Sequence, residues 1–426
     1  MSLFDAYVMV DWSAASQPKR DADSIWLCAI ESRTIEHPLL SNPATRQHAT
    51  LDLIDLLSDL SARGLRVLVG FDFNFGFPHG FAPRLGLKDW SRVWRFVAAG
   101  LQDGPDNANN RFAWAGEINQ RFGTAFWGCP AGRTVAGLTA TRPPDEALPQ
   151  CPLPQCPLPQ FRLAEQRAKG TRPVWQLYGA GSVGGQTITG LPRLEQIRNA
   201  PGLEVEVWPF QTGLAPLTDR PPGSVLLAEI WPSLLDDGIA AKDEPAVKDA
   251  RQVLRLARAL ARLDQEGRLA PLFAGDPSLS AEQRRIAESE EGWILGVTDG
   301  RPALTGRLWG IAAGPGPTDL LTLRAAQTLR DAALLVLADS APARRAQARA
   351  SIAPHSTAPI LDLDAPDLNQ TCRALLRQGR DVALVRHGGD PQSPLMQALA
   401  RFAKATPHLI PGLSCDWESG QSDTSA

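Results

Sequence analysis

The chain has 426 residues, of which 43% are apolar and 21% charged, and its formal net charge is -3. This length predicts more than one hydrophobic core, and we expect two domains. No stretch approaches the ~18 uninterrupted apolar residues of a membrane-spanning helix, and the N-terminal sequence lacks the basic start of a secretory signal. We therefore expect a cytoplasmic protein without membrane segments. The six cysteines form no C-x-x-C pair and indicate neither a disulfide framework nor a zinc site.

The first part of the chain alternates apolar runs with amphipathic segments. Apolar runs predict two strands joined by a turn, then a helix and a third strand, at 6–12, 23–30, 49–63 and 65–72. A broken helical region, two further strands and a long helix are expected at 88–125, 203–210, 224–232 and 245–265. The proline-rich stretch 142–160, which repeats CPLPQ, predicts an exposed insertion.

The second part alternates strictly between strands and helices, which predicts a doubly wound parallel sheet. The expected strands lie at 308–314, 333–339, 381–389 and 407–412, and the expected helices at 319–332, 368–379 and 394–405. A turn-rich stretch at about 296–306 separates the two parts. The predicted domains are therefore 1–295 and 306–416, with a disordered tail at 417–426.

Three acids end predicted strands of the first part, and a fourth lies on its long helix. Asp11, Asp72 and Glu229 follow the apolar runs, and Asp249 shares a helix face with Leu260. Each has a structural alternative, because strand-end aspartates accept backbone hydrogen bonds and an acid in a first helical turn interacts with the helix dipole. Clustered carboxylates, however, are the ligands that Mg²⁺ or Mn²⁺ prefers, and a pair of such ions hydrolyses phosphodiesters.

Four stretches that contain these acids resemble the predicted nucleases of the ribonuclease H-like superfamily, which is related to RuvC-like resolvases. They are VMVDWSAAS, VLVGFDFNFGFP, LLAEIWPSLL and KDARQVLRLARAL, and the resemblance covers about residues 5–270. It implies a mixed-sheet α/β domain in which Asp11, Asp72, Glu229 and Asp249 bind Mg²⁺ or Mn²⁺, water is the nucleophile and nucleic acid is the substrate. The stretch 88–225 is long for a minimal domain of this kind.

A G-x-G-x-x-G pattern is formed by Gly179, Gly181 and Gly184, with Glu204 at the distance of a ribose-binding acid. A dinucleotide site requires a helix that begins at the third glycine, and the sequence GGQTITGLP predicts a poor helix. We therefore expect a loop near the carboxylates, which either contacts a phosphate backbone through its N–H groups or packs closely against other backbone.

The segment 307–416 resembles the N-terminal lobe of tetrapyrrole methylases such as uroporphyrinogen-III C-methyltransferase. The resemblance rests on GIAAGPGPTDLLTLRAAQTL, LLVLADS, VALVRHGGDP and HLIPGLS. In that family the corresponding loops lie against S-adenosylmethionine and the tetrapyrrole. Carried over by position, the resemblance implies that the ligand-binding residues are Gly314, Gly316, Gly388, Gly389, Asp390, Pro391, Pro411, Gly412 and Ser414.

Two departures separate this segment from the methylases. The family sequence G-A-G-P-G-D-P is replaced by Ala312 to Thr318, without the first glycine and the acid, and no second lobe follows the P-G-x-S turn. The sequence therefore predicts a metal-dependent phosphodiester hydrolase fused to an inactive methylase-like lobe. One alternative is a methyltransferase that acts on a tetrapyrrole or in related cofactor synthesis with S-adenosylmethionine, and another is a non-catalytic protein that binds a nucleotide or a tetrapyrrole.

Overall fold

The protein divides into two compact units, Met1–Ala303 and Leu304–Ala426, and each is described by itself. The computed structural model describes residues 2–35, 37–144, 157–168, 170–179, 181–234, 244–298, 306–313, 321–377, 380–387 and 407–410. Most of the predicted insertion at 142–160 and the whole of the predicted tail at 417–426 therefore lie outside the described residues. No helix in the described ranges has both the length and the apolar character that crossing a membrane requires.

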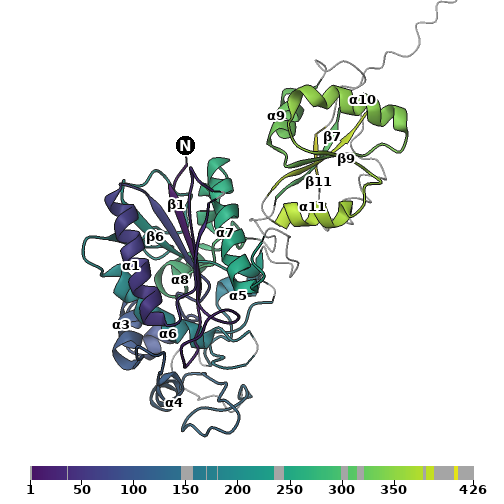
Figure 1. Ribbon diagram of the computed structural model, residues 1–426. Coiled ribbons are helices and arrows are strands. Elements are labelled where there is room, and N and C mark those ends of the chain that lie inside the picture. Colours follow the sequence, from purple (N-terminus) through teal and green to yellow (C-terminus); the bar gives the residue numbers. More distant parts are fainter. Residues whose placement is uncertain are drawn as a thin grey trace, which may run out of the picture. The chain divides into compact units, whose positions relative to one another are not determined.

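The N-terminal unit is built on a six-stranded mixed sheet with the order β3-β2-β1-β4-β6-β5 (Figure 1). Its strands are β1 (Ala6–Asp11), β2 (Trp26–Glu31), β3 (Leu39–Ser41), β4 (Val67–Phe71), β5 (Glu204–Val207) and β6 (Ser224–Glu229). The first three strands pair antiparallel, whereas β4 is parallel to β1, and β6 and β5 continue in the same direction. The carboxyl ends of β1, β4 and β6 therefore meet at one edge of the sheet.

Helices cover both faces of this sheet, and α1 and α7 lie on opposite sides of it (Figure 1). They are α1 (Arg46–Ala62), α2 (Phe81–Arg84), α3 (Trp90–Gly100), α4 (Arg111–Phe122), α5 (Leu163–Arg167), α6 (Gly184–Arg198), α7 (Lys248–Gln265) and α8 (Ala281–Ile286). Short helical turns lie at η2 (Pro232–Leu234), η3 (Ala270–Ala274) and η4 (Ala287–Glu291). Val8 of β1 joins the core that includes Leu53 of α1, while the Tyr7 hydroxyl donates to Asp264 of α7 at 2.6 Å. Neighbouring β1 residues thus face opposite layers, as alternation along a strand requires.

The glycine-rich segment after residue 183 is helical, so the prediction of a poor helix there was wrong. Helix α6 begins at Gly184 and contains Pro192. Its glycines allow close packing: a Cβ on Gly184 would lie 2.1 Å from the Val174 carbonyl oxygen, and one on Gly190 would lie 2.3 Å from the Phe73 ring. Tertiary packing therefore outweighs the low helix propensity of this segment. The run VWQLY before it contributes one isolated bridge, Trp127↔Gln176, and forms no regular strand.

The C-terminal unit is a parallel sheet between two helical layers, and this confirms the parallel-sheet prediction. The strands are β7 (Leu308–Ala312), β8 (Leu334–Leu337), β9 (Ile360–Asp362), β10 (Val382–Arg386) and β11 (Pro407–Ile410), in the order β11-β7-β10-β8-β9. The described helices are α9 (Leu323–Asp331), α10 (Pro342–Ile352), α11 (Leu368–Arg377) and the short turn η6 (Ala353–His355). Helices α9 and α10 pack on one face and α11 on the other.

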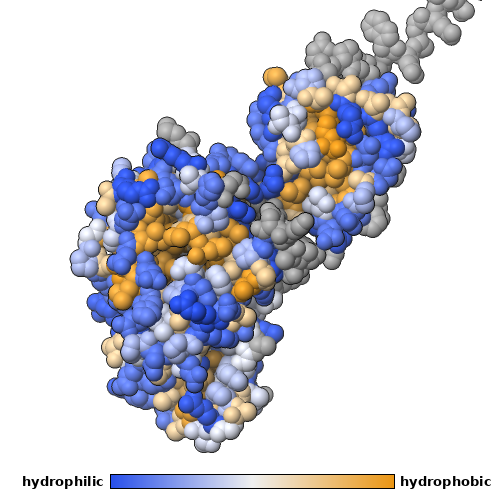
Figure 2. Space-filling view, in the orientation of Figure 1, coloured by the Kyte–Doolittle hydropathy of each residue, from blue (hydrophilic) through white to orange (hydrophobic). Residues whose placement is uncertain are grey.

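Apolar side chains are visible over the strands of this C-terminal sheet, framed by the hydrophilic side chains of its helices (Figure 2). Strand β9, which the sequence did not predict, lies at one edge of the sheet. It is three residues long and half-buried, so its apolar pattern is too short to recognise. The helix expected at 394–405 lies outside the described residues.

Candidate functional site

Two of the sequence-predicted carboxylates lie side by side at the carboxyl edge of the N-terminal sheet. Val10 of β1 pairs with Phe71 of β4, so that Asp11 and Asp72 leave neighbouring parallel strands at the same level. The Trp12 backbone N–H donates to Asp72 Oδ1 at 2.7 Å, and the Asp72 N–H donates to the Val10 carbonyl at 3.3 Å. Both aspartates are half-buried. The backbone thus fixes Asp72 beside the chain that carries Asp11.

Asp249 approaches the same pair from the first turn of α7. Its Oδ2 accepts a hydrogen bond from the Asp23 backbone N–H at 2.7 Å. The side chain is half-buried and contacts the turn before β2, whereas the sequence placed it on the buried face of its helix. Asp249 is close enough for its negative charge to act on both Asp11 and Asp72.

Burial and neighbouring negative charges raise the pKa values of these three carboxyls. Burial raises the pKa of Asp11 well above its usual range, and the charges of Asp72 and Asp249 raise it further. Burial also raises the pKa of Asp72 to about 7, although backbone hydrogen bonds from Trp12 oppose the shift. The pKa of Asp249 is raised mainly by burial. Like charges that share a site favour protonation or a bound cation.

Glu229, the fourth predicted carboxylate, is engaged by an arginine. It ends β6, its side chain is buried, and it accepts from Arg162 Nη1 at 2.8 Å, from Arg162 Nη2 at 2.5 Å and from the Phe75 N–H at 2.9 Å. Burial raises the pKa of Glu229 to about 7, while the Arg162 charge and hydrogen bonds lower it. Both Glu229 oxygens therefore already have partners.

Arg162 is the centre of a buried network that the sequence did not reveal. Its guanidinium is fully buried and also contacts Glu165, with Nε 2.9 Å from Oε1. Glu291 also belongs to this network, because its backbone carbonyl accepts a hydrogen bond from Arg162 Nη1 at 2.6 Å. Its carboxylate accepts hydrogen bonds from the backbone N–H groups of Leu163 and His79. Burial raises the pKa of Glu291 to about 7. The only local sequence signal was the spacing of Arg162 and Glu165, which is common on any helix.

The oxygen donors of Asp11, Asp72 and Asp249 suit Mg²⁺ or Mn²⁺ by their chemistry. In the described part of the chain, however, no group of three or more His, Cys, Asp or Glu side chains is arranged to hold a metal ion. The three aspartates are therefore electrostatic neighbours, and their role as metal ligands stays a prediction.

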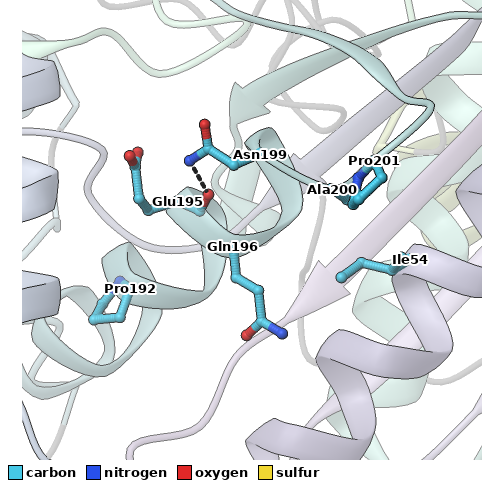
Figure 3. Close-up of a pocket in the computed structure, with 7 residues that line it drawn as sticks. All are labelled: Ile54, Pro192, Glu195, Gln196, Asn199, Ala200 and Pro201. Atoms are coloured by element: carbon cyan, nitrogen blue, oxygen red, sulfur yellow. Dashed lines mark hydrogen bonds between the residues drawn. The ribbon is translucent and has the colours of Figure 1, made fainter.

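A hollow of about 490 Å³ lies between α1 and α6, apart from these carboxylates (Figure 3). It is lined by Ile54 of α1 and by residues of α6 and the turn after it, which are Pro192, Glu195, Gln196, Asn199, Ala200 and Pro201. The Asn199 side-chain amide donates to the Glu195 carbonyl at 2.7 Å, and the Glu195 carboxylate pairs with Arg198 at 2.8 Å. Asn199 and Glu195 thus already have partners, and nothing here indicates a particular ligand.

In the C-terminal unit, three adjacent strands end where the sequence places its ligand-binding loops. Strands β11, β7 and β10 are neighbours and parallel, and they end at Ile410, Ala312 and Arg386. After β10, the His387 backbone N–H donates to Oδ2 of buried Asp339 at 2.7 Å. The predicted binding residues themselves lie outside the described residues: Gly314, Gly316, Gly388, Gly389, Asp390, Pro391, Pro411, Gly412 and Ser414.

The fold and these strand ends define a mixed α/β protein with a parallel-sheet C-terminal unit. Residues 307–415 match the family model of the tetrapyrrole (corrin/porphyrin) methylases, so this unit contains a tetrapyrrole methylase domain. The match lies wholly outside the unit that carries Asp11, Asp72, Glu229 and Asp249, and it bears on none of them.

Similar solved structures include a uroporphyrin-III C-methyltransferase from Thermus thermophilus, with 26% identity over 26% of this chain and 48% of that one, at a TM-score of 0.20. A cobalt precorrin-4 methyltransferase is 24% identical over 25% of this chain and 46% of that one, at a TM-score of 0.22. A putative cobalamin synthesis related protein from Corynebacterium diphtheriae is 19% identical over 26% and 55%, at a TM-score of 0.21. The chain thus spans about half the length of the structures it matches. No curated protein matches the chain.

Proposed function

We propose that the C-terminal unit binds S-adenosylmethionine and a tetrapyrrole-type molecule, and that the protein acts as a methyltransferase. The observation that carries this proposal is the match of residues 307–415 to the tetrapyrrole methylases. We prefer it to the sequence-based expectation of an inactive lobe, because this family match falls on the domain and bears on none of the four carboxylates.

The arrangement of the strands supports the proposal. Ligands of parallel α/β sheets bind beyond the carboxyl ends of the strands, where the strand order changes direction. Strands β11, β7 and β10 lie together at such a point, since the chain passes from β7 to β8 and returns to β10 and β11 on either side of β7. The predicted loops with Gly314, Gly388 and Pro411 follow these strands directly. Loops that follow three neighbouring strands can therefore contact the same ligand.

The chain's own residues hold this edge in place. Asp339 accepts the His387 N–H, and its Oδ1 lies 3.5 Å from Arg386 Nε, so it fixes the backbone where the G-G-D-P loop begins. The glycines of that loop permit close approach of the backbone to a ligand. Bound S-adenosylmethionine would supply a methyl group on a positively charged sulfur, and the carboxylate of Asp390 is proposed to help bind this cofactor.

Calorimetric titration of the full chain with S-adenosylmethionine tests the proposal. We expect saturable binding that falls at least tenfold in Asp390→Asn and is unchanged in Asp331→Asn, which removes an exposed carboxylate from α9. Absence of binding to the wild-type chain contradicts the proposal. Binding without transfer of a labelled methyl group to uroporphyrinogen III would instead support the non-catalytic, ligand-binding alternative.

A second candidate function is divalent-metal-dependent phosphodiester hydrolysis in the N-terminal unit. The observation that favours it is the convergence of Asp11, Asp72 and Asp249, in which the charge of Asp249 raises the pKa values of both other aspartates. The ribonuclease H-like hypothesis is supported by three antiparallel strands followed by parallel ones, with Asp11 on the first strand. Since Arg162 engages Glu229, we assign the metal to the three aspartates and give Glu229 a positioning role.

Metal binding and cleavage test this second candidate separately. Mg²⁺ or Mn²⁺ is expected to raise the Tm of the wild-type chain, because a cation relieves the repulsion among the aspartates. Asp11→Asn should abolish this shift and the cleavage of labelled single-stranded, duplex, hybrid or branched nucleic acids. Asp52→Asn, on the exposed face of α1, is the matched control. Equal metal responses of the two variants would exclude Asp11 as a ligand.

A further inference from the structure

The first turn of α6 and the side chain of Arg111 form a cationic site that includes none of the four carboxylates and none of the C-terminal strand ends. Helix α6 has fifteen residues, its N-cap Val183 provides no side-chain acceptor, and its first turn contains no acid. Within the described ranges, no acceptor takes a hydrogen bond from the backbone N–H groups of Gly185 or Gln186. Unpaired N–H groups and the helix dipole make such a terminus favourable for an anion.

Arg111 brings a buried positive charge to this terminus. It begins α4, and its side chain is 7% exposed. Its Nη1 donates to Ser16 Oγ at 3.0 Å and to Asn109 Oδ1 at 2.8 Å, whereas its Nε is buried and has no hydrogen-bond partner. The Nε lies 3.4 Å from the position that a Cβ on Gly185 would occupy. The unpaired donor of Arg111 thus lies against the first turn of α6.

No carboxylate in the described residues forms an ion pair with Arg111. Burial, together with the charges of Arg46 and Arg133, lowers the pKa of Arg111 to about 10. Asp103, the one acid that acts on it, is already paired with Arg46 at 2.5 Å and with Arg193 at 2.8 Å. A contact with the Phe112 ring, 4.3 Å from the guanidinium carbon, offers only a weak substitute. A buried cation without a counter-ion is unfavourable unless an anion binds beside it.

Close packing explains the glycines here, but it does not explain the arginine. A Cβ on Gly185 would lie 3.0 Å from the Leu177 carbonyl oxygen and 3.1 Å from the Ala14 Cβ, which accounts for glycine at this position. Gln186 is also committed to structure, since its side chain donates to the Trp12 carbonyl at 2.6 Å. Neither contact satisfies Arg111 Nε or the free N–H groups.

We propose that the N-terminus of α6 and Arg111 bind the phosphoryl group of an anionic ligand. The backbone N–H groups of Gly185 and Gln186 and the guanidinium of Arg111 would each donate to its oxygens, as at other helix N-termini that bind phosphate. The source is free phosphate, a phosphate monoester or a phosphodiester, which share this chemistry. The site depends neither on methyl transfer nor on metal binding by the aspartates.

Calorimetric titration of the full chain with inorganic phosphate, adenosine monophosphate and a short single-stranded oligonucleotide tests the proposal and distinguishes these sources. At least one of them should bind with one-to-one stoichiometry. Arg111→Gln should weaken that binding at least tenfold, while Arg121→Gln should leave it unchanged, because Arg121 lies exposed at the other end of the same helix. Equal losses in the two variants would show diffuse charge attraction and overturn the proposal, as would failure of all three probes to bind.

A measurement on the unaltered chain removes any dependence on the folding of the variant. Hydrogen exchange should slow in the segment 182–187 when the bound probe is added, because the ligand accepts hydrogen bonds from the Gly185 and Gln186 N–H groups, which no acceptor in the described residues takes. The N-terminus of α1, where Thr45 already accepts from the His48 N–H, serves as the internal control and should not respond. Equal protection at α1 and α6, or none at α6, would contradict the assignment.

Discussion

The two sheets of the protein differ in where they place charge. In the N-terminal unit, charged groups lie inside the fold, with Arg162 fully buried between Glu165 and Glu229. In the C-terminal unit, strands β7, β8 and β10 are apolar and buried. Its buried acids stand at strand ends, with Asp381 before β10 and Asp339 after β8.

This difference shows which parts of each sheet are free to bind a ligand. A parallel sheet covered on both faces has apolar strands, so its binding groups must come from the loops at the carboxyl edge. In the N-terminal sheet the strand ends themselves carry acids. Such an acid can bind a ligand only if no cationic side chain of the protein already engages its carboxylate. Glu229 is held by Arg162, whereas Asp11 and Asp72 form no ion pair within the described residues, and only the charge of nearby Lys248 lowers the pKa of Asp11.

The largest effect in this comparison is expected from Arg162→Met. Removal of the guanidinium leaves Glu165 and Glu229 buried without their partner, which should lower the free energy of unfolding by ~3–5 kcal/mol. Urea denaturation followed by circular dichroism measures it. Arg285→Met, which breaks an exposed pair with Glu282, should have little effect. Similar losses in the two variants would show that the buried network contributes no more than a surface pair.

A smaller effect is expected from Asp381→Ala in the C-terminal unit. This carboxylate accepts from the Arg307 N–H at 2.7 Å and from Trp309 Nε1 at 2.9 Å, and it is buried. Its loss leaves buried donors unpaired and should reduce stability by about 2 kcal/mol. Hydrogen exchange should increase in β7 and β10. If hydrogen exchange increased in β1 and β4 instead, the effect of losing Asp381 would not be confined to the C-terminal sheet, which would contradict this expectation.

Gly190→Ala tests the close packing that overrides helix propensity in α6. The added methyl would meet the Phe73 ring at 2.3 Å, so the ring or the helix must shift. The gain in helix propensity offsets part of this strain, and a net destabilisation of about 1 kcal/mol is expected. Thermal unfolding measures it. An increase in Tm would show that packing against Phe73 does not require glycine here.

The smallest effect concerns the pH dependence of the carboxylate edge. Because burial raises the pKa of Asp72 from 3.8 to about 7, the folded chain binds this proton more tightly than the unfolded chain. The contribution of protonated Asp72 to the free energy of unfolding is therefore fully present below pH 3.8, and it is lost as the pH rises through about 7. Asp72→Asn should therefore stabilise the protein above pH 7 by about 1 kcal/mol, since solvent screens a half-buried group, and should have no effect near pH 3.8.

Thermal unfolding across this pH range measures the effect, with the exposed Asp52→Asn as the control. Equal pH profiles for wild type and Asp72→Asn would contradict the raised pKa and weaken the case for a metal site beside it.

The sequence predicted those parts of the fold that depend on local pattern. Strands β1, β4 and β6 and helices α1 and α7 were recognised from their periodicity, and the acids at the strand ends were recognised with them. Helix α6 was missed because its glycines are required by distant backbone, such as the Val174 carbonyl beside Gly184. The engagement of Glu229 was missed because Arg162 follows a proline-rich segment far away in the sequence. Periodicity carries no information about either contact.

The central claim, that the C-terminal unit binds S-adenosylmethionine at its carboxyl edge, is tested most directly by hydrogen exchange of the full chain with and without this cofactor. The account predicts protection in segments that begin at the ends of β7, β10 and β11, with no change in β1 or β4. No protection at saturating cofactor, or protection confined to the N-terminal unit, would contradict it.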